Sequence, residues 1–69
     1  MATYKFYYLT NENNSLEETY ESPENIKDVE ISFINYKGNI QSVKRIDILE
    51  DPDKINTDEA LGYISPWLK

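Results

Sequence analysis

Carboxylates are the most numerous reactive groups in this sequence, and they fall into two windows. The chain has 13 Asp and Glu residues against 7 Lys and Arg, which gives a formal net charge of −6 at pH 7. The first window spans residues 12–30 and the second spans residues 47–59. Carboxylates at such density can transfer protons, ligate hard cations or attract a basic partner. The spacing and neighbours of these residues distinguish the three chemistries.

Catalysis lacks its usual side chains in this sequence. Histidine and cysteine are both absent, so the commonest general base and the strongest nucleophile are missing. The sequence has no G-x-S-x-G, no Gly-rich phosphate loop and no H-E-x-x-H. A glycosidase-like carboxylate pair would need a substrate cleft, for which 69 residues leave little room. We therefore predict a protein that is not an enzyme, with no catalytic residues and no cofactor.

The second window resembles a calcium loop in its density of carboxylates, since four lie close together there: Asp51, Asp53, Asp58 and Glu59. An EF-hand loop needs Gly at its sixth position and Glu at its twelfth. Counted from Asp51, these positions hold Asn56 and Gly62, so the pattern fails and we predict no metal site. Carboxylates at the start of a helix are favoured by its macrodipole, which is a sufficient explanation for Asp58.

Binding through charge is the remaining chemistry. Carboxylates on a small domain can imitate the phosphates of DNA and occupy the basic groove of a nucleic-acid-binding protein, because complementary charge speeds encounter and restricts partners. The alternative is that the surplus of acidic residues only maintains solubility. We predict an acidic partner-binding surface formed by Glu17, Glu18, Glu21, Glu24, Asp51 and Asp53.

In being short, acidic and free of His and Cys, the chain is similar to phage-encoded antagonists of host defence such as anti-restriction and anti-CRISPR proteins. The resemblance rests on composition, covers no motif and assigns no role to any residue. It implies a DNA mimic that inhibits or modulates a nucleic-acid-handling protein.

Two further binding modes stay open at this point. Trp67, with Leu68, forms an apolar anchor near the end of the sequence that a protein partner can bury, or else it closes over the core. An exposed sheet edge would permit a homodimer by strand addition. Direct nucleic-acid binding through Lys37, Lys44 and Arg45 is disfavoured, because three bases do not outweigh the acidic remainder.

Length and hydropathy predict where the chain resides and how it is divided. A chain of 69 residues has room for one hydrophobic core, so we predict a single domain over residues 1–69. We find neither a signal-peptide pattern nor an apolar run long enough to cross a bilayer, and we therefore expect a cytoplasmic protein without membrane contact.

The first third of the chain predicts two strands. Residues 2–9 alternate aromatic and mixed side chains and have high β-propensity, and residues 10–15 have the composition of a turn. Residues 16–22 are ambiguous, because Ser15-Leu16-Glu17-Glu18 also fits a helical capping box. We favour a polar edge strand, since Thr19 and Tyr20 favour extended structure and Pro23 restricts Ser22 in the same direction.

The remainder predicts a β-hairpin followed by a helix. Val29, Ile31 and Phe33 alternate with other residues, and a turn at residues 36–39 leads to a second arm over residues 40–49. The apolar parity of that arm breaks, which indicates either a β-bulge near residues 42–45 or a tip that extends past the core. A helix is expected to begin near residue 51 or 56 and to end near residue 64. The predicted fold class is α+β, with a small antiparallel sheet of three to four strands and one short C-terminal helix packed on one face.

Overall fold

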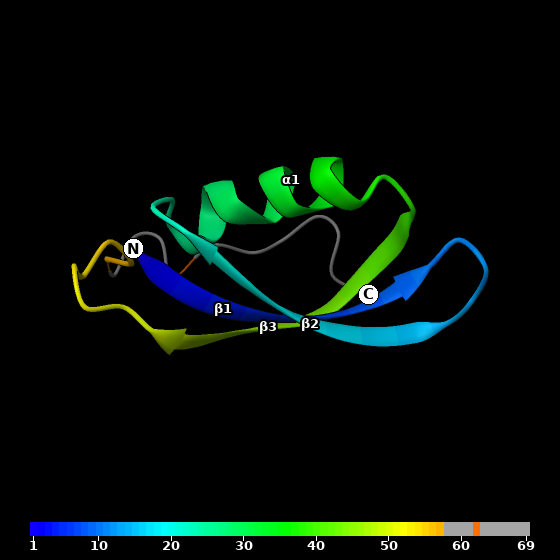
Figure 1. Cartoon of the computed structure of the whole chain (residues 1–69), viewed down its shortest axis with the longest axis horizontal. Helices are drawn as coiled ribbons and strands as arrows, with labels where there is room; N and C mark the ends of the chain where they lie inside the picture. The colour runs from blue at the N-terminus through cyan, green and yellow to red at the C-terminus, as the bar shows by residue number, and fades with distance from the viewer. Residues whose placement is uncertain (58–61, 63–69) are drawn as a thin grey trace.

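Alternating side chains make the first strand the centre of the sheet. The computed structural model describes residues 1–57 and 62 and contains, in chain order, β1 (Ala2–Thr10), β2 (Ser15–Ser22), α1 (Ile26–Lys37) and β3 (Ile40–Glu50). Tyr4, Phe6 and Tyr8 of β1 are buried, whereas the residues between them are only half-buried. The three strands lie in the order β2-β1-β3, and β1 is antiparallel to both neighbours (Figure 1). The predicted α+β class and antiparallel sheet are confirmed.

β1 and β2 form a hairpin, which confirms the strand interpretation of residues 16–22. The pairing runs without a shift from Ala2 opposite Ser22 to Leu9 opposite Ser15. Asn13 adopts φ 65° in the connecting turn, a left-handed conformation that Asn tolerates well. The Thr10 N–H donates to the Asn14 carbonyl at 2.9 Å and closes the turn.

The predicted hairpin over residues 27–49 is wrong in its first arm, which is the helix α1. Val29 and Phe33, four residues apart, are buried on one helix face, whereas Ile31 between them is exposed. The side chain of Asn25 caps the helix by accepting from the Asp28 N–H at 3.1 Å. Gly38 ends it with φ 72°, and its N–H donates to the Ile34 carbonyl. The predicted reversal near residue 38 is therefore a helix C-cap.

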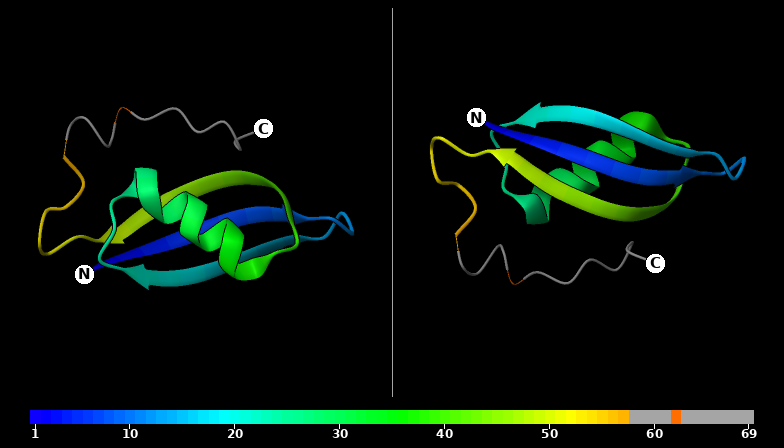
Figure 2. Two further views of the ribbon diagram at one scale, coloured as in Figure 1. Left: turned by 90° about the horizontal axis from the view of Figure 1, so that it is seen from above. Right: turned by 90° about the horizontal axis from the view of Figure 1, so that it is seen from below.

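α1 lies between β2 and β3 in the chain and covers one face of the sheet (Figures 1 and 2). Both of those strands are antiparallel to β1, so they run parallel to each other, and parallel strands need a crossover connection. The sequence predicted one short C-terminal helix, and this placement is wrong for the described residues, whose helix lies between two strands. No helix starts within residues 51–57, and the remainder of the predicted C-terminal helix lies outside the described residues.

The predicted β-bulge near residues 42–45 is confirmed. Tyr7 pairs with Arg45 and Tyr8 pairs with Val43, so Lys44 is an extra residue on β3. Two further register shifts between β1 and β3 leave Gln41 and Leu49 as extra residues on β3. Because of these insertions, the buried face of β3 comprises residues of both parities, Ile40, Val43, Ile46 and Ile48.

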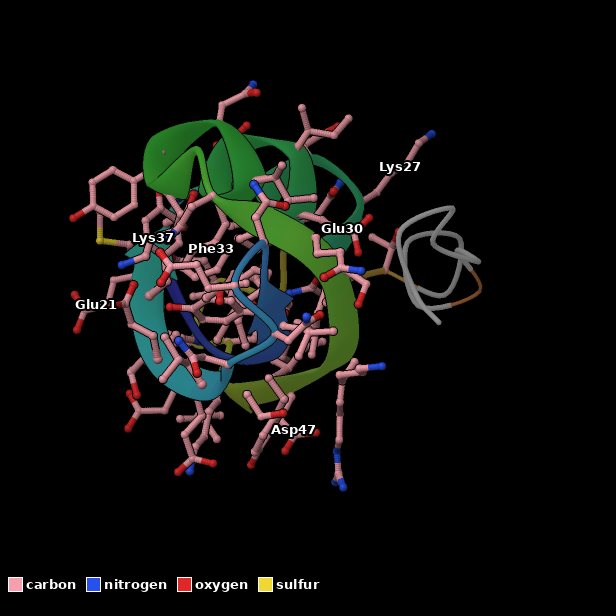
Figure 3. The ribbon with its side chains drawn as sticks, turned by 90° about the vertical axis from the view of Figure 1, so that its right-hand side faces the viewer. Glu21, Lys27, Glu30, Phe33, Lys37 and Asp47 are labelled. Carbon is pink, nitrogen blue, oxygen red and sulfur yellow. The ribbon has the colours of Figure 1, made fainter. Side chains whose placement is uncertain are left out.

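Aromatic rings fill the space between the helix and the sheet. Phe33 stacks on Phe6 with ring centroids 4.0 Å apart and 11° between the planes. Tyr8 and Tyr20 contact Phe33 edge-on at 5.5 and 5.4 Å. Figure 3 shows Phe33 inside the curve that the sheet makes beneath α1. The other face of the sheet takes no part in this core.

Candidate protein-binding face

On the sheet surface that faces away from α1, three rows of residues carry all the ionisable side chains of the directly paired positions, and we call these three rows the open face. Its rows follow from the strand register, since directly opposed residues of antiparallel strands point to the same side. The rows are Glu21-Thr3-Glu50, Thr19-Lys5-Asp47 and Glu17-Tyr7-Arg45. Glu21 and Asp47 point outward from the side of the curved sheet opposite Phe33 (Figure 3). Carboxylates of both acidic windows therefore share one face.

Ion pairs neutralise part of this face. Lys5 Nζ lies 3.4 Å from Glu17 Oε1, and Arg45 Nε lies 2.7 Å from Asp47 Oδ1. The hydrogen bond with Glu17 raises the pKa of Lys5, and that with Asp47 raises the pKa of Arg45. Both cations also lie near the Tyr7 ring, at 5.3 and 5.7 Å from its centroid. The rows of the open face that contain Lys5 and Tyr7 thus form a charge cluster in which two carboxylates balance two bases.

The excess negative charge lies at one end of the open face. Glu21 and Glu50 are exposed and flank Thr3 from the two outer strands. Within the described residues, neither side chain has an ion pair or a side-chain hydrogen bond. Neighbouring strands lie about 4.8 Å apart, and β1 lies between β2 and β3, so the Cα atoms of Glu21 and Glu50 are about 10 Å from each other. At that separation in water the mutual repulsion is only about 0.4 kcal/mol, so the fold tolerates both charges while they remain available to a cation.

No protein-family model, curated protein or solved structure matches this chain. We therefore infer function from the geometry of the face and from the contacts of the individual carboxylates.

Two residues of the predicted acidic surface, Glu17 and Glu21, lie on the open face. Glu18 does not, because it is opposite Phe6 on the helix side, where its Oε1 accepts from Lys37 Nζ at 3.0 Å. The hydrogen bond with Glu18 raises the pKa of Lys37. Glu24 also differs from the prediction: it lies between β2 and α1, and its Oε1 accepts from Ser32 Oγ at 2.8 Å. These contacts give Glu18 and Glu24 structural roles.

The predicted contact residues Asp51 and Asp53 also have partners inside the chain. Asp51 accepts from the backbone N–H groups of Ile55 at 3.0 Å and Asn56 at 2.9 Å. Desolvation of Asp51 by burial opposes ionisation, but these hydrogen bonds outweigh it and lower the pKa of the carboxyl. Asp53 forms an ion pair with the N-terminal ammonium of Met1. Asp51 therefore organises the loop that follows β3.

Asn56 connects this loop to the sheet and to the helix. Its Nδ2 donates to the Tyr4 hydroxyl at 2.9 Å, and its Oδ1 accepts from the Ile26 N–H at 2.6 Å. The Tyr4 hydroxyl in turn donates to the Glu24 carbonyl at 2.6 Å. Burial raises the pKa of the Tyr4 phenol. The network fixes the ends of β1, α1 and β3 relative to one another.

Sequence reasoning missed Asp47 and Glu50 as members of the acidic face. They have opposite parity, and only the shift at Leu49 brings them to the same side of the sheet. For Glu18 a sequence signal exists. Successive side chains of a strand point to opposite faces, so a strand over residues 16–22 puts Glu18 on the face opposite Glu17 and Glu21. The proposed anchor Trp67 lies outside the described residues.

Two of the bases considered for nucleic-acid binding, Lys37 and Arg45, lie on opposite sides of the sheet. Lys37 pairs with β2 on the helix side, whereas Arg45 pairs with Asp47 on the open face. Among the described residues no cluster of three or more carboxylates has metal-binding geometry. In the same part of the chain, no helix has the length and apolar character needed to cross a membrane.

Proposed function

We propose that this chain is a non-catalytic binding protein that uses the open face to inhibit or modulate a nucleic-acid-handling protein. The observation that supports the proposal most directly is that Glu17 and Glu21 of the first acidic window and Asp47 and Glu50 of the second lie on the same side of the sheet. An array of carboxylates held on a hydrogen-bonded sheet presents negative charge to a basic groove with little ordering cost.

The charge balance favours a protein partner over nucleic acid or an anionic lipid surface. Four carboxylates and two bases make up the ionised groups of the open face, and the whole chain has a net charge of −6. Phosphate backbones attract proteins through Lys and Arg and release counterions in doing so. An acidic sheet face repels such polymers, so its natural complement is the basic site that binds them.

Affinity capture with matched charge variants tests this proposal. One column carries the native protein, a second carries Glu21→Gln with Glu50→Gln on the open face, and a third carries Glu12→Gln with Asp28→Asn elsewhere. Each variant removes two carboxylate charges, and all four residues are exposed. Bacterial lysate is applied at low and high salt, and retained proteins are identified by mass spectrometry.

We expect the native and control columns to retain a DNA- or RNA-binding protein at low salt, and the open-face variant to lose it. High salt should release the partner, because the Debye length falls to about 3 Å at 1 M ionic strength and attraction between exposed charges is then screened. Retention that is insensitive to salt, or equal on all three columns, would contradict the proposal. In that case Trp67→Ala would be the next variant to examine.

A further inference from the structure

The two edges of the sheet differ in regularity. β3 has three register shifts against β1, whereas β2 pairs with β1 over its whole length without a shift. Bulges and local twisting protect an edge from pairing with another chain, and a regular edge strand lacks that protection. Within residues 1–57 no strand pairs with the outer side of β2. β2 is therefore the edge suited to accept an additional strand.

The hydrogen-bond alternation identifies which backbone groups of β2 point outward. Thr10 N–H bonds to the β2 side through Asn14, and Asn11 N–H bonds to the β3 side through Asn39, both at 2.9 Å. In antiparallel pairing the bonds alternate along a strand, so even-numbered residues of β1 bond to even-numbered residues of β2. The N–H and C=O groups of Glu17, Thr19 and Glu21 consequently point away from β1.

The side chains along this edge have different chemistry on the two sides of the sheet. Glu17 and Glu21 are exposed on the open face, with Thr19 between them. On the helix side, Leu16 is 48% exposed and Tyr20 lies 6.0 Å from the ring of Tyr36, which is 68% exposed. An added strand would meet Glu17 and Glu21 on the open face. On the helix side it would meet Leu16 and Tyr20, with Glu18 between them already paired with Lys37.

A second copy of this chain fits the edge poorly. In the two antiparallel self-pairings that use most of β2, either Glu17 faces Glu21 of the copy or Glu18 faces its own counterpart. Like charges directly opposite each other destabilise a strand pair. A strand with alternating basic and apolar residues avoids this repulsion, because its basic side chains lie opposite Glu17 and Glu21 and its apolar side chains lie beside Leu16 and Tyr20.

We propose that β2 binds an extended segment of a partner protein by strand addition, and that the segment alternates basic and apolar residues. Backbone hydrogen bonds to Glu17, Thr19 and Glu21 supply affinity that does not depend on the sequence of the bound segment. The alternating side chains supply selectivity. The inference rests on the proposed function only for the positive charge of the partner. It adds the conformation and the sequence pattern of the bound segment.

Nuclear magnetic resonance with the full chain tests the proposal with a defined probe. The probe is a capped peptide as long as β2 that alternates lysine and valine. The control peptide has the same sequence with N-methyl groups on alternate backbone amides, which removes hydrogen-bond donors and keeps every charge. Amide shifts and hydrogen exchange of Glu17, Thr19 and Glu21 report whether a strand has been added.

We expect the unmodified peptide to protect these three amides from exchange and to bind at least about tenfold more tightly than the N-methylated peptide. Thr19→Pro removes an outward donor without touching the ladder to β1, and it should weaken binding by a similar factor, whereas Thr19→Val should not. Equal, salt-sensitive binding of both peptides would overturn strand addition and leave the acidic-face function intact. Absence of binding by either peptide would also overturn strand addition, while capture of the partner would still decide the proposed function.

Discussion

At the scale of single residues, the environment of each carboxylate decides what it does. Asp51 and Glu24 accept hydrogen bonds within the fold, whereas Glu21 and Glu50 lie exposed on either side of Thr3. All four come from the same two sequence windows and are indistinguishable by composition. Sequence alone therefore predicted that this chain has acidic surface but could not separate structural carboxylates from those available to a partner.

Asp51 should make folding stability depend on pH. Hydrogen bonds in the folded state lower the pKa of its carboxyl below the unfolded value, which is about 3.9. The stability that Asp51 contributes is therefore fully present above that value and is lost as the pH falls through the lowered folded-state pKa. We expect Asp51→Asn to be less stable than the native protein at pH 7, with the difference vanishing in acid.

Urea unfolding of both proteins across this pH range measures the effect. Glu12→Gln serves as the control for loss of one negative charge, because Glu12 is exposed in the β1–β2 turn. If the difference in free energy of unfolding between the native protein and Asp51→Asn stays constant down to the lowest pH, the Asp51 charge does not stabilise the loop.

At the scale of elements, residues 26–37 carry signals for a strand and for a helix. We predicted a strand, and the structure has a helix. Val29, Ile31 and Phe33 satisfy a strand alternation, and their β-branched and aromatic types favour it. The helix depends instead on Asn25 as N-cap and Gly38 as C-cap, with Val29 and Phe33 four residues apart on the buried face. β1 and β2 were predictable because alternation and turn chemistry agree there with the packing, whereas in β3 the break in alternation itself indicated the bulge.

Gly38 tests the helix end. Its φ of 72° is costly for a residue with a Cβ, although no atom beyond the two neighbouring residues lies within 4 Å of where that Cβ would be. We therefore expect Gly38→Ala to lower the free energy of unfolding by about 1 kcal/mol through backbone strain alone. Gly38→Asn should cost less, because Asn adopts the left-handed region more readily. Denaturant midpoints provide the comparison, and equal losses for the two variants would argue against a conformational cause.

The bulge at Lys44 permits a deletion test. Removal of Lys44 leaves Val43 opposite Tyr8 and Arg45 opposite Tyr7, so every buried residue keeps its face. We expect this deletion to cost about 1 kcal/mol. Deletion of Asp47 instead makes Ile46 and Ile48 adjacent, so one of them must leave the core at a cost of at least about 2 kcal/mol. Urea denaturation of both deletion variants shows which one is less stable. A larger loss of stability on deletion of Lys44 than on deletion of Asp47 would show that the register is set elsewhere.

At the scale of the whole molecule, the sheet separates two surfaces with different chemistry. One face carries the aromatic core under α1, and the other carries charged residues from all three strands. The two acidic windows are far apart in sequence and meet only because β2 and β3 flank β1. That convergence was beyond sequence reasoning, since it depends on the crossover through α1 and on the shift at Leu49.

We propose that the open face occupies the nucleic-acid-binding site of its partner. Fluorescence anisotropy of labelled DNA on a captured partner tests it most directly, with the native chain, the Glu21→Gln and Glu50→Gln double variant and the Glu12→Gln and Asp28→Asn control as competitors. We expect the native and control proteins to displace the DNA and the open-face variant to require at least about tenfold more protein. Formation of a ternary complex with DNA still bound, or equal displacement by all three, would contradict the claim.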